Sequence, residues 1–513
     1  MGPIQSHRQW SFTTPPAYCL CALIEPNFES SLERNEECYV NSPKDVPCGQ
    51  GRIPLYAVVA ETVEEVQATV RFARERDLRL IVRNTGHGSV RSCGPDSLQI
   101  NLSKFKSINH TQHFIPQGGS QSMGQAVTLG AAILGHDASE TGAKEGFFIL
   151  PGICSTVGIA GGYLQGGGLS YLSPIYGMPA DNALEFVVVT AKGEIVVAND
   201  FQNQDLFWAL RGGGGGTFGI AVSSTVRAFS DVPATAVSLN VTIPANESAD
   251  REKLWSSLRA VLSMYPALDD KQNGVVVMLA LMPDQHHTAI VSLIGWAVNA
   301  TIADVDAQYA PLCAQLDALG IPYTYSTLFQ PSLAALLATP LAMDIGGDNI
   351  VEGSIFLSKD LFYEADGPAR IVDIVARSQV WPGDYVGFEL SGGQVRENKD
   401  VVDTPIHPTW RDSLALMWLR RNMSSSPSPA EQVEYRRNMT MFQMPLLRSL
   451  ESRMGSYVNV ADMDEPKFQD AFWGDNYERL YRIKKEWDED GLFIVRAGVG
   501  SEDWDEEGLC RVR

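Results

Sequence analysis

Glycine is concentrated in two short segments, and this distribution restricts the possible folds more than any other feature of the chain. One segment runs from Gly158 to Gly168 and the other from Gly212 to Gly219. Without a Cβ, the backbone can approach a flat ring or a diphosphate closely and turn its N–H groups toward it. Tight turns alone would account for one of these segments but hardly for both. The pattern therefore predicts that the chain binds a dinucleotide.

A Rossmann motif is the obvious alternative source of such glycines. That motif places Gly-x-Gly-x-x-Gly directly after the first strand, where it opens a helix. Here the first expected strand, residues 57–60, leads into a helix predicted over residues 62–76, with Thr62 as N-cap and Glu65 completing a capping box. The next strand, residues 78–82, leads into a loop of small residues, Asn84 to Gly88. The sequence therefore favours a different dinucleotide-binding fold.

Length and charge limit the number of domains and the class of partner. At 513 residues the chain exceeds the size of a single hydrophobic core, so about two domains are expected. The net charge of -21 disfavours nucleic acid and anionic membranes, because the field of the whole protein repels both. No apolar run approaches the roughly 18 to 20 residues that a membrane-spanning helix needs. We therefore expect a small-molecule substrate, no nucleic acid and no membrane partner.

The composition changes near Asp231, which indicates a second domain. From there to about Arg448, strands expected over residues 237–243, 275–282 and 289–298 alternate with amphipathic helices expected over residues 250–265 and 302–319. This order predicts an antiparallel sheet with helices on one face.

Cysteines and glycosylation signals indicate a secreted protein. Four of the eight cysteines, Cys19, Cys21, Cys38 and Cys48, lie in the first 50 residues, where two disulfides with three possible pairings would hold a segment with little core. A zinc site is less favoured, because the Cys-x-Cys spacing is wrong for the usual structural sites. Residues 1–10 lack a signal-peptide pattern, so a leader is expected to be absent from this chain. N-glycans are expected at seven Asn-x-Ser/Thr sequons: Asn101, Asn109, Asn240, Asn246, Asn299, Asn422 and Asn438.

Five motifs follow one another along the chain in an order typical of one family. They are Arg83-Asn84-Thr85-Gly86-His87, Gly152-Ile153-Cys154-Ser155-Thr156-Val157-Gly158, Tyr176-Gly177-Met178-Pro179-Ala180-Asp181-Asn182, Asp205-Leu206-Phe207-Trp208-Ala209-Leu210-Arg211-Gly212, and Tyr457-Val458-Asn459 with Trp473-Gly474-Asp475-Asn476-Tyr477. Together they resemble the berberine bridge enzyme-like group of the vanillyl alcohol oxidase and p-cresol methylhydroxylase (PCMH) superfamily. The resemblance covers roughly residues 51–226 and 457–493. Any one motif alone would be weak, whereas five in order are specific.

The resemblance implies the fold class and the domain boundaries. It implies an α+β, two-domain flavoprotein with a PCMH-type FAD-binding domain and a substrate domain whose antiparallel sheet, covered by helices, roofs the flavin. The expected boundaries are a disulfide-rich segment at 1–50, the first part of the FAD-binding domain at 51–230, the substrate domain at 231–450, and the C-terminal return of the FAD-binding domain at 451–513.

Two residues in these motifs are expected to hold the cofactor covalently. Members of this group bond the 8α-methyl and C6 positions of the flavin through a histidine and a cysteine, so the resemblance implies covalent FAD on His87 and Cys154. Outside such motifs, a turn histidine and a buried free thiol would be the simpler interpretations. The other cofactor-binding residues that we expect are Arg83, Asn84, Thr85, Gly86, Gly88, Ser89, Gly152, Val157, Gly158, Gly161, Gly162, Gly166, Gly167, Asn182, Gly219, Ile220 and Asn459.

Val157 bears on the electron acceptor. The family places the side chain at this position against the C4a edge of the flavin, where valine leaves room for oxygen and a leucine or isoleucine tends to exclude it. The resemblance therefore implies an oxidase that uses O2 and releases hydrogen peroxide. A dehydrogenase, with Val157 serving only for packing, stays open.

The catalytic base is not set by the motifs. Positions that carry a base or a tyrosine in relatives are Gly162, Gly168 and Ser89 here. Removing a proton from a substrate heteroatom needs a basic group within reach. The three candidates are Tyr457 as first choice, Glu389 and His407; their alternatives are a packed tyrosine, a solvated strand face and a loop residue.

The sequence thus predicts an FAD-dependent oxidase that takes hydride from a C–H next to oxygen or nitrogen of an alcohol, sugar or specialised metabolite. Two other hypotheses stay open. One is an oxidative cyclase or dehydrogenase of specialised-metabolite biosynthesis, and the other is a flavin-bearing glycoprotein without turnover. The substrate, the disulfide pairing and the oligomeric state are not predicted.

Overall fold

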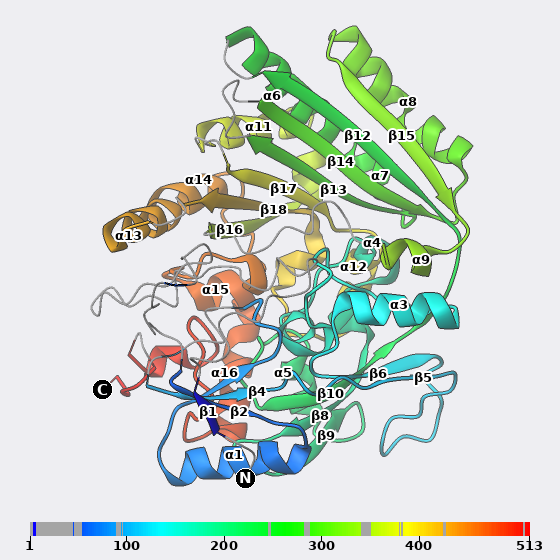
Figure 1. The fold of residues 1–513 in the computed structure, drawn as a ribbon. Coiled ribbons are helices and arrows are strands. Elements are labelled where there is room, and N and C mark those ends of the chain that lie inside the picture. Colours follow the sequence, from blue (N-terminus) through cyan, green and yellow to red (C-terminus); the bar gives the residue numbers. More distant parts are fainter. Residues whose placement is uncertain are drawn as a thin grey trace.

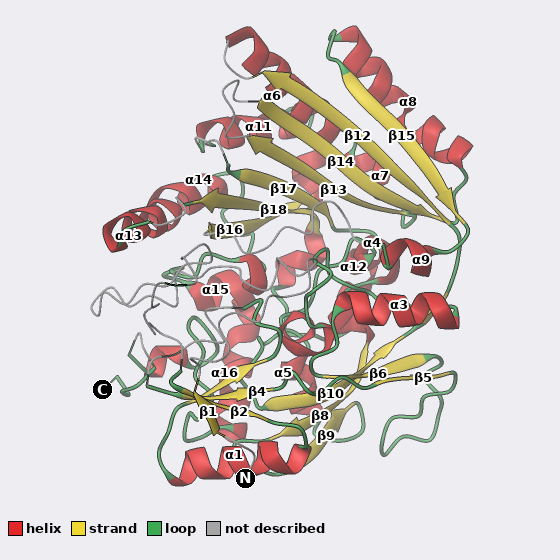
Figure 2. Ribbon diagram, viewed as in Figure 1, coloured by secondary structure: helices red, strands yellow, loops and turns green. Residues whose placement is uncertain are grey.

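The computed structural model describes residues 4–6, 45, 54–88, 94, 96–244, 248–281, 288–339, 350–378, 380, 383–423, 427–505 and 508–512. Helices and sheets are mixed along the chain, which confirms the predicted α+β class (Figure 2). Figure 1 shows one large sheet above a lower part that holds smaller sheets and both labelled ends of the chain. Within the described residues, no helix is long and apolar enough to cross a bilayer. The four N-terminal cysteines and Ser89 lie outside the described residues.

The large sheet is antiparallel throughout. In spatial order its strands are β15 (Tyr323–Gln330), β12 (Ala234–Pro244), β14 (Thr288–Val298), β13 (Asn273–Leu281), β17 (Tyr385–Leu390), β18 (Ser413–Asn422) and β16 (Ile350–Ser358). Helices cover one face of it: α6 (Ser248–Leu262), α7 (Tyr265–Leu268), α8 (Ile302–Ala318) and α11 (Gly367–Arg377) (Figure 1). An antiparallel sheet covered by helices on one face is what the sequence predicts for this region.

The described residues form three further sheets, of which the smallest pairs β7 (Phe147–Phe148) with β11 (Phe229–Ser230). The first is β1 (Ile4–Ser6), β2 (Tyr56–Val59), β4 (Leu98–Asn101) and β3 (Leu80–Arg83), of which the last three are parallel. The second is antiparallel: β5 (Ile108–Thr111), β6 (Ala126–Gly130), β10 (Ile220–Arg227), β8 (Ala183–Val189) and β9 (Ile195–Asn199). The helices of the lower part are α1 (Val63–Glu75), α3 (Gly135–Glu145), α5 (Gln204–Leu210), α15 (Phe468–Trp473) and α16 (Tyr477–Trp487).

Local sequence chemistry explains how α1 begins and which face it buries. Thr62 is the N-cap and accepts from the N–H of Glu65, whose carboxylate bonds back to the N-cap backbone, so the predicted capping box is confirmed. Val66 and Val70 lie four residues apart on one side and are fully buried. The strand of residues 80–83 follows and directs the chain into the loop at Asn84.

The C-terminal helices return to the N-terminal part of the chain. Lys484 on α16 is buried, and its Nζ donates to the carbonyls of Thr217 (2.8 Å) and Phe493 (2.6 Å) and pairs with Asp488 at 2.5 Å. Trp473 on α15 donates from Nε1 to the carbonyl of Gly212 at 2.9 Å. These bonds fasten the returning segment to the second glycine-rich segment of the chain.

A buried ion pair connects the lower part to the segment between β17 and β18. Arg411 donates from both terminal nitrogens to Asp181, at 2.7 and 2.6 Å. Their side chains are 5% and 2% exposed. Breaking such a pair costs about 3 to 5 kcal/mol because one charge stays buried and unpaired. This explains why an aspartate belongs in the motif at residues 176–182.

Candidate active site

A cavity of about 320 Å³ lies between the lower part and the large sheet. Five regions form its walls: the loop after β3, the glycine segment around η4 (Ile159–Tyr163), the second glycine-rich segment at residues 215–221, the sheet face opposite the helices, and the C-terminal segment after residue 456. The predicted site residues that line the cavity are Asn84, Thr85, Gly86, His87, Gly88, Gly152, Cys154, Val157, Gly158, Gly161, Gly162, Gly219, Glu389, Tyr457 and Asn459.

The imidazole of His87 is held against Thr156. Its Nε2 lies 2.8 Å from Oγ1 of Thr156. Burial, and then the positive charge of Arg420, lower the pKa of His87 to about 4, although a hydrogen bond with Thr156 opposes the change. At neutral pH the ring is therefore uncharged and keeps a nucleophilic lone pair.

The side chain of Cys154 contacts Thr156 as well. Its Sγ is 3.6 Å from Oγ1 of Thr156, so one hydroxyl lies beside both side chains that the motifs single out. Cys154 is disulfide-bonded. In this state the sulfur cannot act as a thiolate.

The amide of Asn84 and the neighbouring glycines form a close contact. A Cβ built on Gly158 or Gly161 would come within 2.7 or 2.1 Å of Nδ2 of Asn84, so only glycine fits at both positions. A Cβ on Gly162 would meet nothing within 4 Å, because this residue opens into the cavity. The Nδ2 and Oδ1 atoms of Asn84 are shielded from solvent and have no partner among the described residues.

Glu389 is a buried acid on the sheet face of the cavity. Glu389 is 3% exposed, and its Oε1 has no hydrogen-bond partner among the described residues. Burial raises the pKa of Glu389 to about 8, so the carboxyl is neutral at pH 7. Tyr163 and Tyr171 lie close enough that its charge contributes to raising their pKa values.

The register of the sheet explains which side chains join Glu389. Successive residues of a strand point to opposite faces, and cross-strand partners share a face. Glu389 on β17 pairs with Leu416 on β18. Gly387, two residues earlier on β17, pairs with Trp418, two residues later on β18. Arg420 follows on β18. Leu416, Trp418 and Arg420 all line the cavity, as the alternation requires.

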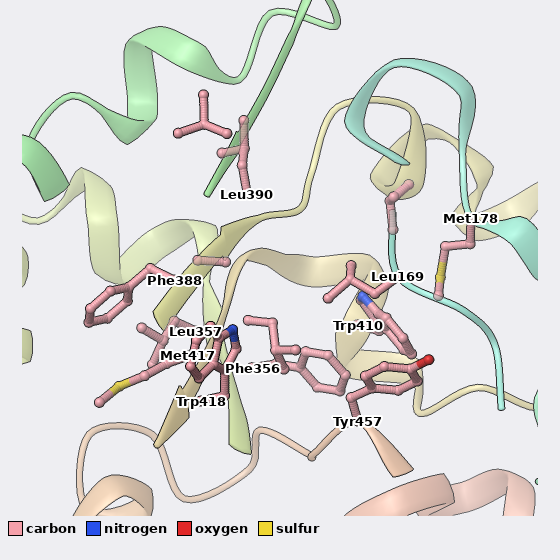
Figure 3. Packing of buried hydrophobic residues seen from close by; sticks show 14 of the residues in the cluster. Leu169, Met178, Phe356, Leu357, Phe388, Leu390, Trp410, Met417, Trp418 and Tyr457 are labelled. Carbon is pink, nitrogen blue, oxygen red and sulfur yellow. The ribbon is translucent and has the colours of Figure 1, made fainter. Parts of the chain in front are cut away.

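Tyr457 lies at the cavity wall in an aromatic cluster. Its ring packs 4.9 Å from that of Trp410, which packs 4.7 Å from Phe356 (Figure 3). Asn459 donates from Nδ2 to the Tyr457 hydroxyl at 2.8 Å and to the carbonyl of Gly162 at 3.0 Å. The tyrosine is therefore fixed beside the glycine that opens into the cavity.

The structure does not bring His407 to the cavity wall. Its Nε2 bonds the carbonyl of Asp470 at 3.1 Å, and its Nδ1 bonds Thr409. A Cβ on Gly455 would lie 2.4 Å from its ring, so the backbone covers it closely. Both nitrogens are occupied by local contacts, and we do not retain His407 as a base.

Five other predicted cofactor residues also lie away from the cavity wall. Ile220 is fully buried in β10, and Asn182 donates to the carbonyls of Tyr176 and Met178. The remaining three are Arg83, Gly166 and Gly167. A Cβ on Gly166 would lie 2.4 Å from Nδ2 of Asn459, so this glycine acts on the site by seating Asn459.

Sequence reasoning missed the cavity residues that come from the large sheet. Met278, Glu352, Leu416, Trp418 and Arg420 all line the cavity. The strand β18 is buried on both faces over most of its length, so no alternation of polar and apolar residues marks the inward face. The one usable signal is a tryptophan and an arginine two residues apart on a strand.

Two family models match the chain. The model described as FAD binding domain matches residues 54–199, and the model described as berberine and berberine like matches residues 456–500. Both matched regions contribute walls of the cavity.

Relatives match over nearly the whole chain. A flavin-dependent oxygenase of Aspergillus ustus, ucdF, is 45% identical over 496 residues, covering 96% of this chain and 89% of that protein. The FAD-linked oxidoreductase malF of Malbranchea aurantiaca is 42% identical, covering 94% of this chain and 82% of that protein. The VAO-type flavoprotein MtVAO615 of Myceliophthora thermophila C1 superposes with a TM-score of 0.81 at 27% identity, covering 99% of this chain and 98% of that one.

Proposed function

Because this chain belongs to the berberine bridge enzyme-like FAD-linked oxidoreductases, we propose that it is an oxidase with covalently bound FAD. Its substrate is a small alcohol, sugar or specialised metabolite, oxidised at a C–H bond next to oxygen or nitrogen. The observation that carries this proposal is the convergence of His87 and Cys154 on the hydroxyl of Thr156 at the cavity wall.

The residues present fit a flavin. The shielded amide of Asn84 has donors and an acceptor without described partners, as expected of a group that bonds a bound molecule. Gly158 and Gly161 let the chain pack onto that amide, and Gly162 leaves open space beside it. Asn84, the loop 85–88 and Asn459 would hold the cofactor.

His87 and Cys154 are the proposed covalent links. His87 is neutral at physiological pH and is therefore competent as a nucleophile. A thiol reductant must first cleave the disulfide at Cys154 by thiol–disulfide exchange, becoming oxidised itself, before this sulfur can bond a flavin. The histidyl link has no such requirement, so it is the one that we expect to form first.

FAD, when bound, accepts a hydride from the substrate and is reoxidised by O2, which yields hydrogen peroxide. We assign the removal of the substrate's heteroatom proton to Glu389. Its carboxylate form, populated above a pKa of about 8, lies in the cavity, and no described residue competes for its Oε1. Tyr457, fixed by Asn459, serves to orient the substrate.

Val157 supports O2 as the electron acceptor. It lines the cavity three residues after Cys154 and is only partly buried, so a larger side chain there would occupy cavity space. A compact valine is compatible with oxygen access at this wall.

The attachment is tested on the holoprotein by acid precipitation followed by peptide mapping. The wild type should keep its yellow colour in the pellet, with flavin on the peptides of His87 and Cys154. His87→Ala and Cys154→Ala should each keep one link, and the double variant should release all FAD. Ser155→Ala is the matched control, because its hydroxyl is not at the two links. Free FAD in the wild-type supernatant contradicts the proposal.

A further inference from the structure

The sheet wall of the cavity carries an ion pair that the proposed reaction does not use. Glu352 on β16 and Arg420 on β18 are partners in the antiparallel register. Nε of Arg420 donates to Oε2 of Glu352 at 2.8 Å, and both residues line the cavity. The side chain of Arg420 is 30% exposed, whereas that of Glu352 is 9% exposed. The arginine is therefore anchored at its Nε while its end faces the cavity.

The N–H groups on the two terminal nitrogens of Arg420 are available to a ligand, because the bond to Glu352 uses Nε. Among the described residues, the only hydrogen-bond partner of the Arg420 side chain is Glu352, which its Nε contacts. A guanidinium presents its N–H groups in a planar fork that matches the two oxygens of a carboxylate. Arg496 also lines the cavity, but its Nη2 already bonds Asp464 at 2.6 Å. Arg420 is thus the better placed of these two cations for a ligand.

Trp418 fixes the orientation of Arg420 and supplies an aromatic wall. The guanidinium carbon of Arg420 lies 4.9 Å from the centroid of the Trp418 ring. A Cβ on Gly387 would lie 2.0 Å from Cε2 and Cζ2 of that ring, so the indole rests on the backbone of β17. Any larger residue at position 387 would push the indole into the cavity. The glycine therefore sets the depth of this wall.

The neighbouring acid does not repel an anion at neutral pH. Glu389 shares this face of the sheet, and burial raises its pKa to about 8, which keeps it neutral at pH 7. The charge of Glu352 is already directed at Nε of Arg420. Since the whole protein carries a net charge of -21, an anionic ligand depends on a local cation such as Arg420.

Resting on the proposed function, we propose that the substrate is an aromatic carboxylic acid whose carboxylate is bound by the terminal nitrogens of Arg420 and whose ring packs against Trp418. Arg420 is then a specificity-determining residue, Glu352 a positioning residue for it, and Gly387 the residue that makes room for the ring.

The experiment compares acids with their uncharged amides on the holoenzyme. Phenylacetate, indole-3-acetate and 4-hydroxyphenylacetate are titrated against phenylacetamide, indole-3-acetamide and 4-hydroxyphenylacetamide, by calorimetry and by the flavin absorbance shift. Variants are Arg420→Met, Arg420→Lys and, as a matched control, Arg370→Met; Arg370 lies on α11 and forms an exposed ion pair with Glu364. The flavin content of each sample is recorded first.

We expect the wild type and Arg370→Met to bind at least one acid about tenfold to a hundredfold more tightly than its amide, the size of a charge-assisted hydrogen bond. Arg420→Met should abolish that preference, and Arg420→Lys should keep part of it. Equal binding of acids and amides, no binding of any acid, or a preference that persists in Arg420→Met overturns the inference. If any of these three outcomes is found with yellow protein, it refutes this inference alone. A colourless protein refutes the proposed function.

Discussion

Replacing Glu389 with glutamine tests both the burial of this acid and its proposed role. Burial raises its pKa from 4.5 to about 8. Between these two pH values the folded protein holds a proton that the unfolded chain does not, so wild-type stability falls as the pH rises through this interval. At about 1.4 kcal/mol per pKa unit, the proton uptake costs about 3 kcal/mol at pH 7 and less than about 1 kcal/mol at pH 5. Glutamine has the same shape and needs no proton.

We therefore expect Glu389→Gln to be more stable than the wild type by about 3 kcal/mol at pH 7, with most of this gain absent at pH 5. Urea unfolding of the holoprotein at both pH values measures the difference. The control is Glu434→Gln on the exposed side of α13 (Pro429–Asn438), which should change stability by less than about 0.5 kcal/mol at either pH. A stability difference between Glu389→Gln and wild type that is equal at pH 5 and pH 7 would refute the reasoning.

Kinetics of the same variant test the catalytic role separately. If the carboxylate of Glu389 takes a proton from the substrate, the wild-type rate of flavin reduction should rise with pH to a plateau above a midpoint near 8. In Glu389→Gln this rise should vanish, and the rate should fall about 10²-fold to 10⁴-fold. An unchanged rate and profile would leave the acid with a purely structural role.

Two further predictions concern the C-terminal return and oxygen access. Lys484→Met leaves Asp488 buried without its cation and should lower the free energy of unfolding in urea by about 3 to 5 kcal/mol. Lys485→Met, whose partner Asp503 is partly exposed, should lower it by less than about 1 kcal/mol. Equal losses would contradict the stabilising role of the buried pair between Lys484 and Asp488. Val157→Leu should slow flavin reoxidation by air about tenfold or more while leaving reduction by substrate nearly unchanged, as measured by stopped flow. Equal slowing of both steps would show that this side chain does not control oxygen access.

The fold was predictable where the signal is local. The capping box at Thr62 and Glu65 marks the start of α1, and alternating apolar residues mark β12 and β14, so these elements appear where the sequence predicts them. The inward face of Leu480 and Ile483 on α16 follows from helical spacing alone.

The site was predictable only where the family motifs form its walls, at residues 84–88, 152–162 and 457–459. Arg420 meets Glu352 across 68 residues of sequence through a strand pairing that no local pattern encodes. The burial of Glu389 was equally hidden, since the alternative of a solvated strand face is wrong for a residue that is 3% exposed. A pattern also does not report accessibility: the expected glycan acceptor Asn101 is 8% exposed and accepts from the N–H of Ser103.

The order in which the walls occur along the chain has a consequence for biosynthesis. Residues 457–463, 496 and 497 complete a cavity whose first wall is made by residues 84–88. The bonds of Lys484 to the carbonyls of Thr217 and Phe493 fasten this C-terminal part to the second glycine-rich segment. Until residues 457–497 have left the ribosome and folded, the pocket lacks one side. A chain truncated before residue 457 should therefore fail to retain the cofactor, because its cavity lacks this wall.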